Sequence, residues 1–340
     1  MSNTSQTDET ILSPEEEALF QSLRVTDWGQ FHGQLQVKQS LQIAIQAARE
    51  RNESLDHLLL YGPPGLGKTT LCHLLAKELG VKLHVTSGTA LTKPGDLAAI
   101  VTNLGPGDIL FIDEIHRLPK AVEETLYPAM EDYALDIIIG KGPSARTIRL
   151  DLPRFTLVGA TTRFGQLTGP FRDRFGLIHR LQYYLPNELA VIIRQAAGLL
   201  GAKLMDDASL EIARRSRGTP RIGLKLLKRV RDYAQVSGAE SITMDGVVKA
   251  LTLFAVDELG LTDADRQFLT HIIAQFSGGP VGLSTLTASL NEDGITIEEV
   301  VEPYLLQVGF LKRTPKGRIA TPAAYQHLRL PFTDSDSTTK

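Results

Sequence analysis

The chain has 340 residues, 42% of them apolar, and a formal net charge of −3, so it can form about two to three domains and cannot bind nucleic acid through an overall positive field. Its single cysteine, Cys72, excludes an internal disulfide and suits a reducing compartment. No apolar run approaches the ~20 residues of a membrane span, and the N-terminal segment MSNTSQTDET lacks the lysine and arginine of a signal or transit peptide. We therefore expect a cytoplasmic protein without a membrane partner.

The first part of the chain alternates between strand-like and helix-like segments. Residues 1–18 are polar and predict a disordered tail. Beyond them, apolar runs of strand length alternate with helical stretches such as KTTLCHLLAKEL at 68–79. This alternation predicts an α/β domain over residues 19–184, with a parallel sheet and helices on both faces. The strand-like runs lie at 57–61, 81–88, 108–115, 155–162 and 177–184.

The strand-like runs stop after residue 184. Residues 185–257 carry apolar residues at three- and four-residue spacing, which predicts a small all-helical domain. At the other end of the chain, residues 333–340 (TDSDSTTK) are polar and predict a second disordered tail.

Residues 258–332 predict a third domain of three helices and a hairpin. The first helix opens near Thr262, Ser284 can cap the second, and Thr296 with Glu299 forms a capping box that opens the third. A hairpin that turns on Pro-Lys-Gly follows. Three helices before a hairpin are the outline of a winged helix.

The segment GPPGLGKTT at 62–70 matches the phosphate-binding loop G-x-x-x-x-G-K-[ST] and stands between a predicted strand and a predicted helix. Glycines let backbone N–H groups close around phosphates at a helix N-terminus, where the dipole favours anions. Lys68 would reach the β- and γ-phosphates of ATP, and the Thr69 hydroxyl would ligate Mg²⁺. A glycine-rich turn without a ligand is the alternative, which the strand–loop–helix context disfavours. The predicted nucleotide contacts in this loop are Gly62, Gly65, Gly67, Lys68, Thr69 and Thr70.

The run ILFIDEI at 109–115 is an apolar strand that ends in two carboxylates. An acid at a buried strand end is costly unless a cation compensates it, so Mg²⁺ bound by Asp113 explains this residue better than a solvated edge does. Glu114 can then orient and polarise the attacking water. The GATT segment brings two more hydroxyls to this edge. We assign Thr161 to the γ-phosphate or the lytic water, with Thr162 as the alternative and a plain turn residue as the structural explanation.

For two basic segments, residue spacing alone does not decide between a structural and a functional role. In GPFRDRFG at 169–176, Arg172 and Arg174 flank an aspartate. They form either a surface ion pair worth under about 1 kcal/mol or an arginine finger for a neighbouring subunit's nucleotide, worth on the order of 10³ to 10⁵ in rate. Arg221, in RGTPRIG, is expected to begin a helix with a basic face. Either this face is solvated, or Arg221 reaches toward the phosphates.

Several segments together carry a resemblance to a known family. With them the chain resembles the RuvB family of AAA+ ATPases, the Holliday-junction branch-migration motors, over about residues 20 to 332. Walker motifs are common to many families, whereas the long central and C-terminal strings are specific. The segments are GPPGLGKTT, FIDEIHR, EDYALDIIIGKGPSARTIRLDLPRFTLVGATTR, FRDRFG, GTPRIG and GGPVGLSTL…VEPYLLQVGFLKRTPKGRIATPAAY.

The resemblance implies roles for individual residues. Arg174 corresponds to the family's arginine finger, acting in trans on the next subunit, with Arg172 as a structural or supporting neighbour. Arg221 becomes the small domain's sensor of nucleotide state. Further nucleotide contacts implied in this way are Leu23, Arg24 and Tyr184 at the adenine and ribose end, and Glu131, Asp132 and Tyr133 in this pocket or that of the adjacent subunit.

The implied activity is that of an ATP-driven homo-hexameric DNA translocase. It would migrate Holliday junctions in homologous recombination and DNA repair, with ATP hydrolysis tilting the small domain through Arg221. The implied protein partners are RuvA, docked on a β-hairpin around Gly140 to Ser144, and RuvC in a larger complex. From the residues alone, that segment indicates only two strands around a turn.

The predicted hairpin of the third domain carries a basic cluster with no acid inside it. Lys312, Arg313, Lys316 and Arg318 suit phosphates and a minor groove, without the base-reading side chains that sequence specificity needs. A solvated basic hairpin is the alternative. On a winged helix attached to a motor we expect duplex DNA binding, with Arg313 and Arg318 as the leading candidates.

Some residues depart from the family pattern or carry no expected role. The family commonly has an aliphatic residue where this chain has His32, and Ala-Asn-Arg where it has Gly223-Leu224-Lys225. A helical glycine costs up to about 1 kcal/mol and bears on the geometry of the sensor helix. We expect His73 and His116 to be ordinary packing or surface residues, and Cys72 to lie in the core.

Two other functions are compatible with the nucleotide motifs. A protein-remodelling AAA+ ATPase would carry an aromatic-hydrophobic pore loop and no DNA-binding wing. A nucleotide-gated DNA-binding switch would need a recognition helix rich in arginine, asparagine or glutamine, whereas TLTASL offers little that reads bases. The sequence favours the motor over both.

Overall fold

The computed structural model describes residues 22–139 and 146–332. The predicted tails and the hairpin turn at Gly140 to Ser144 lie outside the described residues. The chain divides into two compact units, one of residues 23–196 and 218–224 and the other formed by the remaining described residues.

The first unit is built on a five-stranded parallel sheet with the strand order β2-β3-β6-β1-β7. Each predicted run contains one of these strands, so the α/β fold class is confirmed. Because β3, β6 and β1 are neighbours, the segments that follow them meet at one edge of the sheet. The strands are β1 (Leu58–Tyr61), β2 (Leu83–Ser87), β3 (Ile109–Asp113), β6 (Thr156–Thr161) and β7 (Leu177–Arg180).

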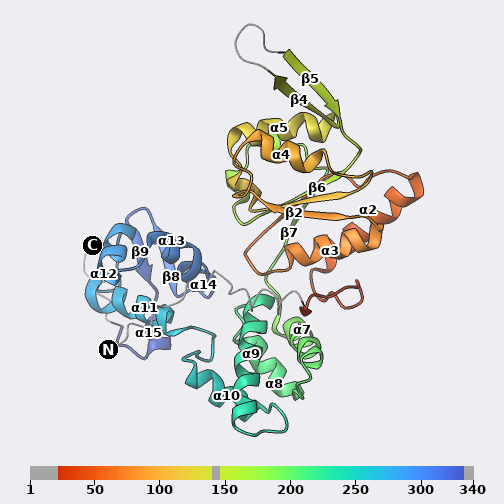
Figure 1. The fold of residues 1–340 in the computed structure, drawn as a ribbon. Helices are drawn as coiled ribbons and strands as arrows, with labels where there is room; N and C mark the ends of the chain where they lie inside the picture. Colours follow the sequence, from red (N-terminus) through yellow and green to blue (C-terminus); the bar gives the residue numbers. More distant parts are fainter. Residues whose placement is uncertain (1–21, 140–145, 333–340) are drawn as a thin grey trace. The chain divides into compact units, whose positions relative to one another are not determined.

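Helices cover both faces of this sheet (Figure 1). On one side, Leu59, Ile112 and Leu157 are fully buried in a core cluster with Leu97 and Leu126 of the covering helices. Cys72 is also fully buried, as expected. The helical elements are α2 (Leu35–Arg51), α3 (Lys68–Leu79), α4 (Pro94–Val101), η1 (Ile115–Arg117), α5 (Lys120–Glu131), η3 (Phe164–Gln166), α6 (Gly169–Arg172) and α7 (Pro186–Leu199).

An antiparallel hairpin, β4 (Ala134–Ile139) and β5 (Arg146–Asp151), extends beyond the helical layer of the first unit (Figure 1). Ile148 and Leu150 on β5 are exposed. The two strands agree with the expectation from the sequence.

The helices of the predicted small all-helical domain, called the lid below, follow the sheet. Besides α7, they are α8 (Asp206–Arg214), α9 (Pro220–Val236) and α10 (Met244–Leu253). Helices α8 and α10 contact each other and bury Ile212 and Leu251 completely. Gly223 lies inside α9 without interrupting it.

The C-terminal part of the second unit is a winged helix whose core includes Phe268, Leu286 and Leu305. Its hairpin has the register Thr314↔Gly317, so the turn consists of the two residues between them. The elements are α11 (Asp263–Phe276), α12 (Leu283–Leu290), α13 (Gly294–Thr296), the π-helical turn η4 (Ile297–Val301), α14 (Glu302–Gln307), β8 (Leu311–Thr314), β9 (Gly317–Ala320) and α15 (Pro322–Leu328).

Two predicted caps in this domain are wrong. Helix α12 begins at Leu283 with Gly282 as its N-cap, so Ser284 lies inside the helix. The third helical segment begins at Gly294, because the Oδ1 atom of Asp293 accepts a hydrogen bond from the Ile295 N–H group. Thr296 is therefore helical and does not cap. The first helix, by contrast, begins after Thr262 in a capping box with Asp265.

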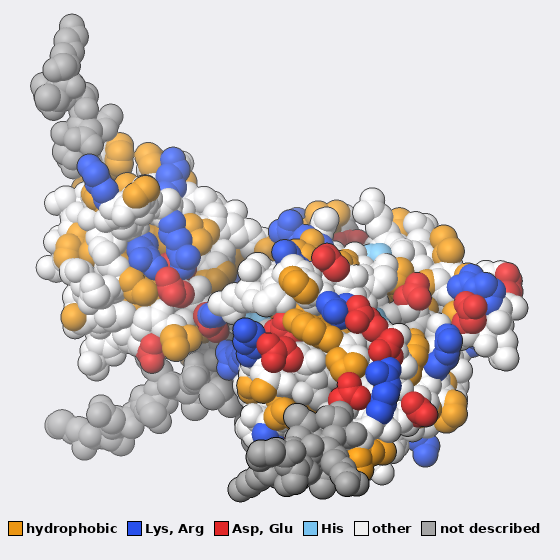
Figure 2. Space-filling model, turned by 90° about the horizontal axis from the view of Figure 1, so that it is seen from above, with side chains coloured by type: hydrophobic (Ala, Val, Ile, Leu, Met, Phe, Trp, Pro, Cys, Tyr) orange, Lys and Arg blue, Asp and Glu red, His pale blue; other side chains and the backbone are white. Residues whose placement is uncertain are grey.

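No helix among the described residues is long and apolar enough to cross a membrane. Acidic and basic side chains are interspersed over the face drawn in Figure 2. This mixture agrees with the small net charge of −3, so an anionic partner would have to be met by local clusters.

Candidate functional site

The phosphate-binding loop requires glycine at three positions. Gly62, Gly65 and Gly67 have φ values of 140°, 76° and 99°, a region that side chains disfavour. At Gly62 a Cβ atom would also stand 2.5 Å from the Leu181 carbonyl oxygen. Lys68 opens α3 and donates from Nζ to the carbonyl oxygens of Gly62 (2.8 Å) and Pro63 (2.9 Å). Burial lowers the pKa of Lys68, and the carboxylates of Asp113 and Glu114 oppose this effect.

Residues from later segments of the first unit surround the loop. The backbone N–H of Arg221 approaches the Gly65 carbonyl oxygen at 3.4 Å, and a side chain at Gly65 would clash with Arg221 and Thr219. The Tyr184 hydroxyl donates to the Leu66 carbonyl oxygen at 3.1 Å. The structure thus brings the predicted Tyr184 and Arg221 to the loop.

The predicted N-terminal contacts lie beside α3, the helix that the loop opens. Leu23 is buried, and the guanidinium of Arg24 contacts the imidazole of His73 on α3. Thr69 and Thr70 are in the first turn of the same helix and are partly exposed.

Two acids end the central strand β3. Asp113 is its last residue, and Glu114 follows in a left-handed conformation with φ 48°. The Glu114 N–H donates to Asp113 Oδ1 at 2.9 Å. Gly88, at the end of the neighbouring β2, donates its N–H to the Asp113 carbonyl oxygen at 2.8 Å, and a Cβ there would overlap the Glu114 carbonyl oxygen. Burial and the adjacent Asp113 raise the pKa of Glu114.

The two threonines at the end of β6 have different environments. Thr162 donates from its hydroxyl to Glu114 Oε2 at 3.3 Å. Thr161 is fully buried, and its hydroxyl oxygen lies 2.9 Å from His116 Nδ1 and accepts from the Arg163 N–H at 2.9 Å. The hydroxyl that reaches the acid is therefore that of Thr162.

His116 lies at this site, although its sequence context predicted an ordinary packing or surface residue. Its side chain is 3% exposed, and Nδ1 lies 3.2 Å from Glu114 Oε2. A signal was present in the sequence, because the histidine stands two positions after the acid in DEIH.

Arg174 is held by its own chain at the far end of α5. Its Nη2 atom lies 3.1 Å from Glu131 Oε1, and Nη1 donates to the Pro170 carbonyl oxygen at 2.6 Å. The guanidinium carbon stands 4.1 Å from the centroid of the Tyr127 ring. A backbone carbonyl, a carboxylate and an aromatic face therefore fix this cation in one place.

The predicted group of Glu131, Asp132 and Tyr133 lies with Arg174 at the end of α5. Asp132 Oδ2 accepts from Arg149 Nη2 at 2.8 Å. Tyr133 packs against His57 and Phe155. These contacts make the group part of a surface that includes the predicted finger.

The wing is the β8–β9 hairpin, and its basic side chains contact two acids from preceding helical segments. The hairpin sequence itself contains no acid. Glu302, the fully buried first residue of α14, accepts from Arg318 Nε at 2.7 Å and from Arg313 Nε at 2.5 Å. Glu298 on η4 pairs with Arg318 Nη2 at 2.9 Å. Lys312 and Lys316 are exposed. The two arginines are thus partly neutralised, while the lysines extend the positive charge outward.

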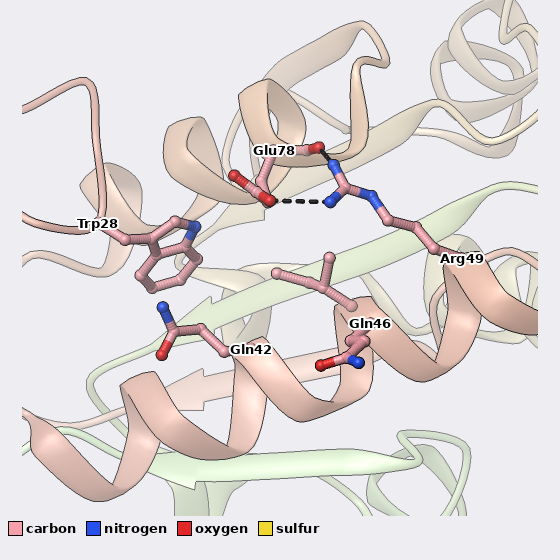
Figure 3. A pocket seen from close by; sticks show the side chains of 6 residues that line it. Trp28, Gln42, Gln46, Arg49 and Glu78 are labelled. Carbon is pink, nitrogen blue, oxygen red and sulfur yellow. Dashed lines mark hydrogen bonds and ion pairs between the residues drawn. The ribbon is translucent and has the colours of Figure 1, made fainter.

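A separate hollow lies between α2 and the end of α3 (Figure 3). Its volume is about 280 Å³. Arg49 pairs with Glu78 across it at 2.9 Å, and Trp28, Gln42, Ile45 and Gln46 complete the lining. None of the predicted site residues lines it.

Comparisons with known proteins agree with this geometry. Three family models match consecutive parts of the chain: the Holliday junction DNA helicase RuvB P-loop domain at residues 23–181, the RuvB AAA lid domain at 184–257 and the RuvB C-terminal winged helix domain at 258–329. Among solved structures, the chain is similar to the RuvB Holliday junction branch migration motor of Thermotoga maritima, with 51% identity over 92% of this chain and 100% of that chain and a TM-score of 0.83. A lysine-to-arginine variant of the Thermotoga maritima RuvB also has 51% identity, over 92% and 99% of the two chains, with a TM-score of 0.84.

Proposed function

Because the chain belongs to the RuvB family of Holliday junction branch-migration helicases, we propose that it acts as a ring of six identical subunits that uses ATP to drive duplex DNA through a four-way junction. The observation that carries this proposal is the meeting of Lys68, Glu114 and Thr162 at one edge of the sheet, beside the loop that Arg221 and Tyr184 contact. A nucleotide bound there would touch both the sheet domain and the first turn of α9.

Each residue of the site has a chemical task in this proposal. The loop N–H groups and the Lys68 ammonium bind the phosphates of ATP. Glu114 orients the attacking water and accepts its proton, and Thr162 fixes the direction of the carboxylate. We transfer the role expected of Thr161 to Thr162, since the hydroxyl of Thr161 is occupied by His116 and the Arg163 N–H.

The residues present also fit Mg²⁺. Thr69 offers a hydroxyl in the first turn of α3 and Asp113 a carboxylate at the end of β3, and oxygen atoms of these kinds are what Mg²⁺ prefers. When bound, the ion would neutralise phosphate charge as ATP reacts.

The finger would act between subunits. Arg174 is fixed to α5 of its own chain through Glu131 and Tyr127. The guanidinium is presented with the Glu131–Asp132–Tyr133 group, which the family resemblance connects with nucleotide. We propose that this surface faces the ATP of the next subunit, where Arg174 stabilises the charge that develops on the transferred phosphoryl group.

The wing would contact DNA through its phosphates. Lys312, Lys316 and Arg313 supply the exposed charge, and charge contacts to phosphates carry no sequence information. Arg318 would support them from behind by holding β9 onto Glu302. The proposed protein partners are RuvA, through the hairpin around Gly140 to Ser144, and RuvC.

The test measures strand separation of a synthetic four-way junction in the presence of RuvA, with ATP or a non-hydrolysable analogue. Wild type should separate the strands with ATP only. Arg174→Ala should bind nucleotide but hydrolyse ATP on the order of 10³-fold more slowly. Arg172→Ala is the matched control, because this arginine stacks on Phe164 of its own chain.

Mixing two inactive variants tests the trans arrangement. Glu114→Gln lacks the base but keeps its finger, and Arg174→Ala lacks the finger but keeps its pocket. Mixed rings should regain ATP hydrolysis at interfaces that combine an intact pocket with an intact finger. If mixing restores nothing while both variants bind nucleotide, the finger assignment is wrong. If wild type hydrolyses ATP and leaves the junction untouched, the DNA substrate is wrong.

A further inference from the structure

His116 connects the ends of two neighbouring strands at the proposed catalytic acid. Its Nδ1 atom lies 3.2 Å from Glu114 Oε2, after β3, and 2.9 Å from Thr161 Oγ1, on β6. The same threonine oxygen accepts the Arg163 N–H. One nearly buried ring thus joins the acid to the backbone that follows β6.

The protonation state of this ring decides what it can do. Burial, together with Arg117 and Arg163, lowers the pKa of His116 to about 4, so the ring is neutral near pH 7 and has one N–H group. An ionised carboxylate only accepts hydrogen bonds. The proton must therefore be on Nδ1 for the ring to bind Glu114.

Glu114 needs such support. A residue with a side chain in the left-handed region costs on the order of 1–3 kcal/mol and persists only where its surroundings over-determine it. The peptide group that precedes Glu114 is held by the Gly88 N–H, which donates to the Asp113 carbonyl oxygen, and the Arg117 N–H donates to the Glu114 carbonyl oxygen at 2.8 Å. Its carboxylate accepts from the Thr162 hydroxyl and lies 3.2 Å from His116 Nδ1.

We propose that His116 is the positioning residue of the ATPase site, whose Nδ1–H group aims the Glu114 carboxylate at the attacking water and ties it to the end of β6. This proposal rests on the proposed role of Glu114 as the base. In this proposal His116 acts on the reaction only through Glu114.

Two amide variants separate positioning from packing. The amide nitrogen of His116→Asn stands near the place of Nδ1, whereas that of His116→Gln stands near the place of Nε2. His116→Phe keeps the ring volume and removes the donor. His179→Phe on β7 is the matched control, because the buried His179 Nε2 has no hydrogen bond in the described part of the chain. The readouts on the full-length protein with DNA are kcat, the Kd of a fluorescent ADP analogue and the melting temperature.

We expect kcat to fall on the order of 10²-fold in His116→Phe and His116→Gln, with nucleotide Kd changed by less than about threefold, because a misplaced catalytic group costs rate rather than ground-state binding. His116→Asn should keep kcat within about threefold of wild type, as should His179→Phe. The opposite order, with Phe active and Asn inactive, would show that the ring only fills space and would overturn the proposal. So would equal loss of hydrolysis and nucleotide binding in all three His116 variants. A wild type that fails to hydrolyse ATP would instead overturn the proposed function.

Discussion

Arg217 donates from Nη2 to Asp265 Oδ2 at 2.5 Å, and the two side chains are only 8% and 3% exposed. Arg217 precedes the lid helix α9, and Asp265 is in the first turn of α11 of the winged helix. The guanidinium also donates from Nε to the Gly260 carbonyl oxygen and stands 4.8 Å from the centroid of the Tyr304 ring. A buried ion pair therefore joins the lid to the winged helix within one compact unit.

Removing this arginine should destabilise the protein strongly. Arg217→Met leaves the Asp265 carboxylate buried without its cation, and breaking a buried pair costs about 3–5 kcal/mol. The control is Arg214→Met, because Arg214 is 56% exposed and lies 3.7 Å from Glu211, so its loss should cost less than about 1 kcal/mol. Urea unfolding of the full chain measures both. Equal decreases in the free energy of unfolding would show that the buried pair stabilises the protein no more than the exposed pair does.

A methyl group at the end of β2 should disable hydrolysis. The Cβ atom of Gly88→Ala would overlap the Glu114 carbonyl oxygen, so the backbone that presents the acid must move. We expect kcat to fall at least about tenfold with little change in nucleotide Kd. Gly95→Ala is the control, since a Cβ there meets nothing within 4 Å. Normal hydrolysis by Gly88→Ala would mean that the acid tolerates displacement.

Replacing the lysines of the wing should change DNA binding, whereas replacing Arg318 should change protein stability. In the proposed DNA contact, replacing Lys312 and Lys316 by alanine removes two phosphate contacts, so the slope of log K against log salt should become shallower by about 2. Arg318→Ala should instead lower the melting temperature, because it removes one cation from the fully buried Glu302. Titration of duplex DNA at several salt concentrations, with thermal unfolding, distinguishes the two. A shallower slope for Arg318→Ala without loss of stability would place that side chain on DNA.

Acid should weaken the fold through His57. Its Nδ1 accepts from the Leu157 N–H at 2.9 Å, so Nε2–H donates to the Met130 carbonyl oxygen at 3.0 Å and the ring is neutral. Burial lowers the pKa of His57 from its usual value of 6.5. The unfolded chain therefore binds a proton that the folded chain does not, and the free energy of unfolding decreases as pH falls below about 6.5.

Unfolding in urea between about pH 7.5 and about pH 5 measures this effect. His57→Asn should be less stable at the upper pH, because it disturbs both hydrogen bonds, but should lose less stability on acidification. Parallel pH profiles for wild type and variant would contradict the assignment.

The sheet and its phosphate-binding loop could be predicted from the sequence, because residues close together in the chain determine both. Apolar runs of strand length end at Gly62 or at Asp113, and the glycine spacing around Lys68 has few other uses. The helix starts at Ser284 and Thr296 were wrong because an earlier residue already begins each helix. Gly282 takes the cap in one case, and the carboxylate of Asp293 in the other.

The side-chain networks could not be read in the same way. His116 and Thr161 meet only because β3 and β6 are neighbours in the sheet. The hairpin sequence around Arg313 and Arg318 contains no acid, yet packing places Glu302 beneath it. Such pairings depend on tertiary contacts between distant segments, which residue spacing does not report.

The setting of Arg174 has an entropic consequence. A free arginine side chain loses about 1.5–2 kcal/mol of rotamer entropy when it is fixed. Here Glu131, Tyr127 and the Pro170 carbonyl have already fixed it during folding. In the proposed ring, the guanidinium would therefore meet the neighbouring phosphates without a further loss of freedom, so that more of its attraction to the developing charge lowers the barrier.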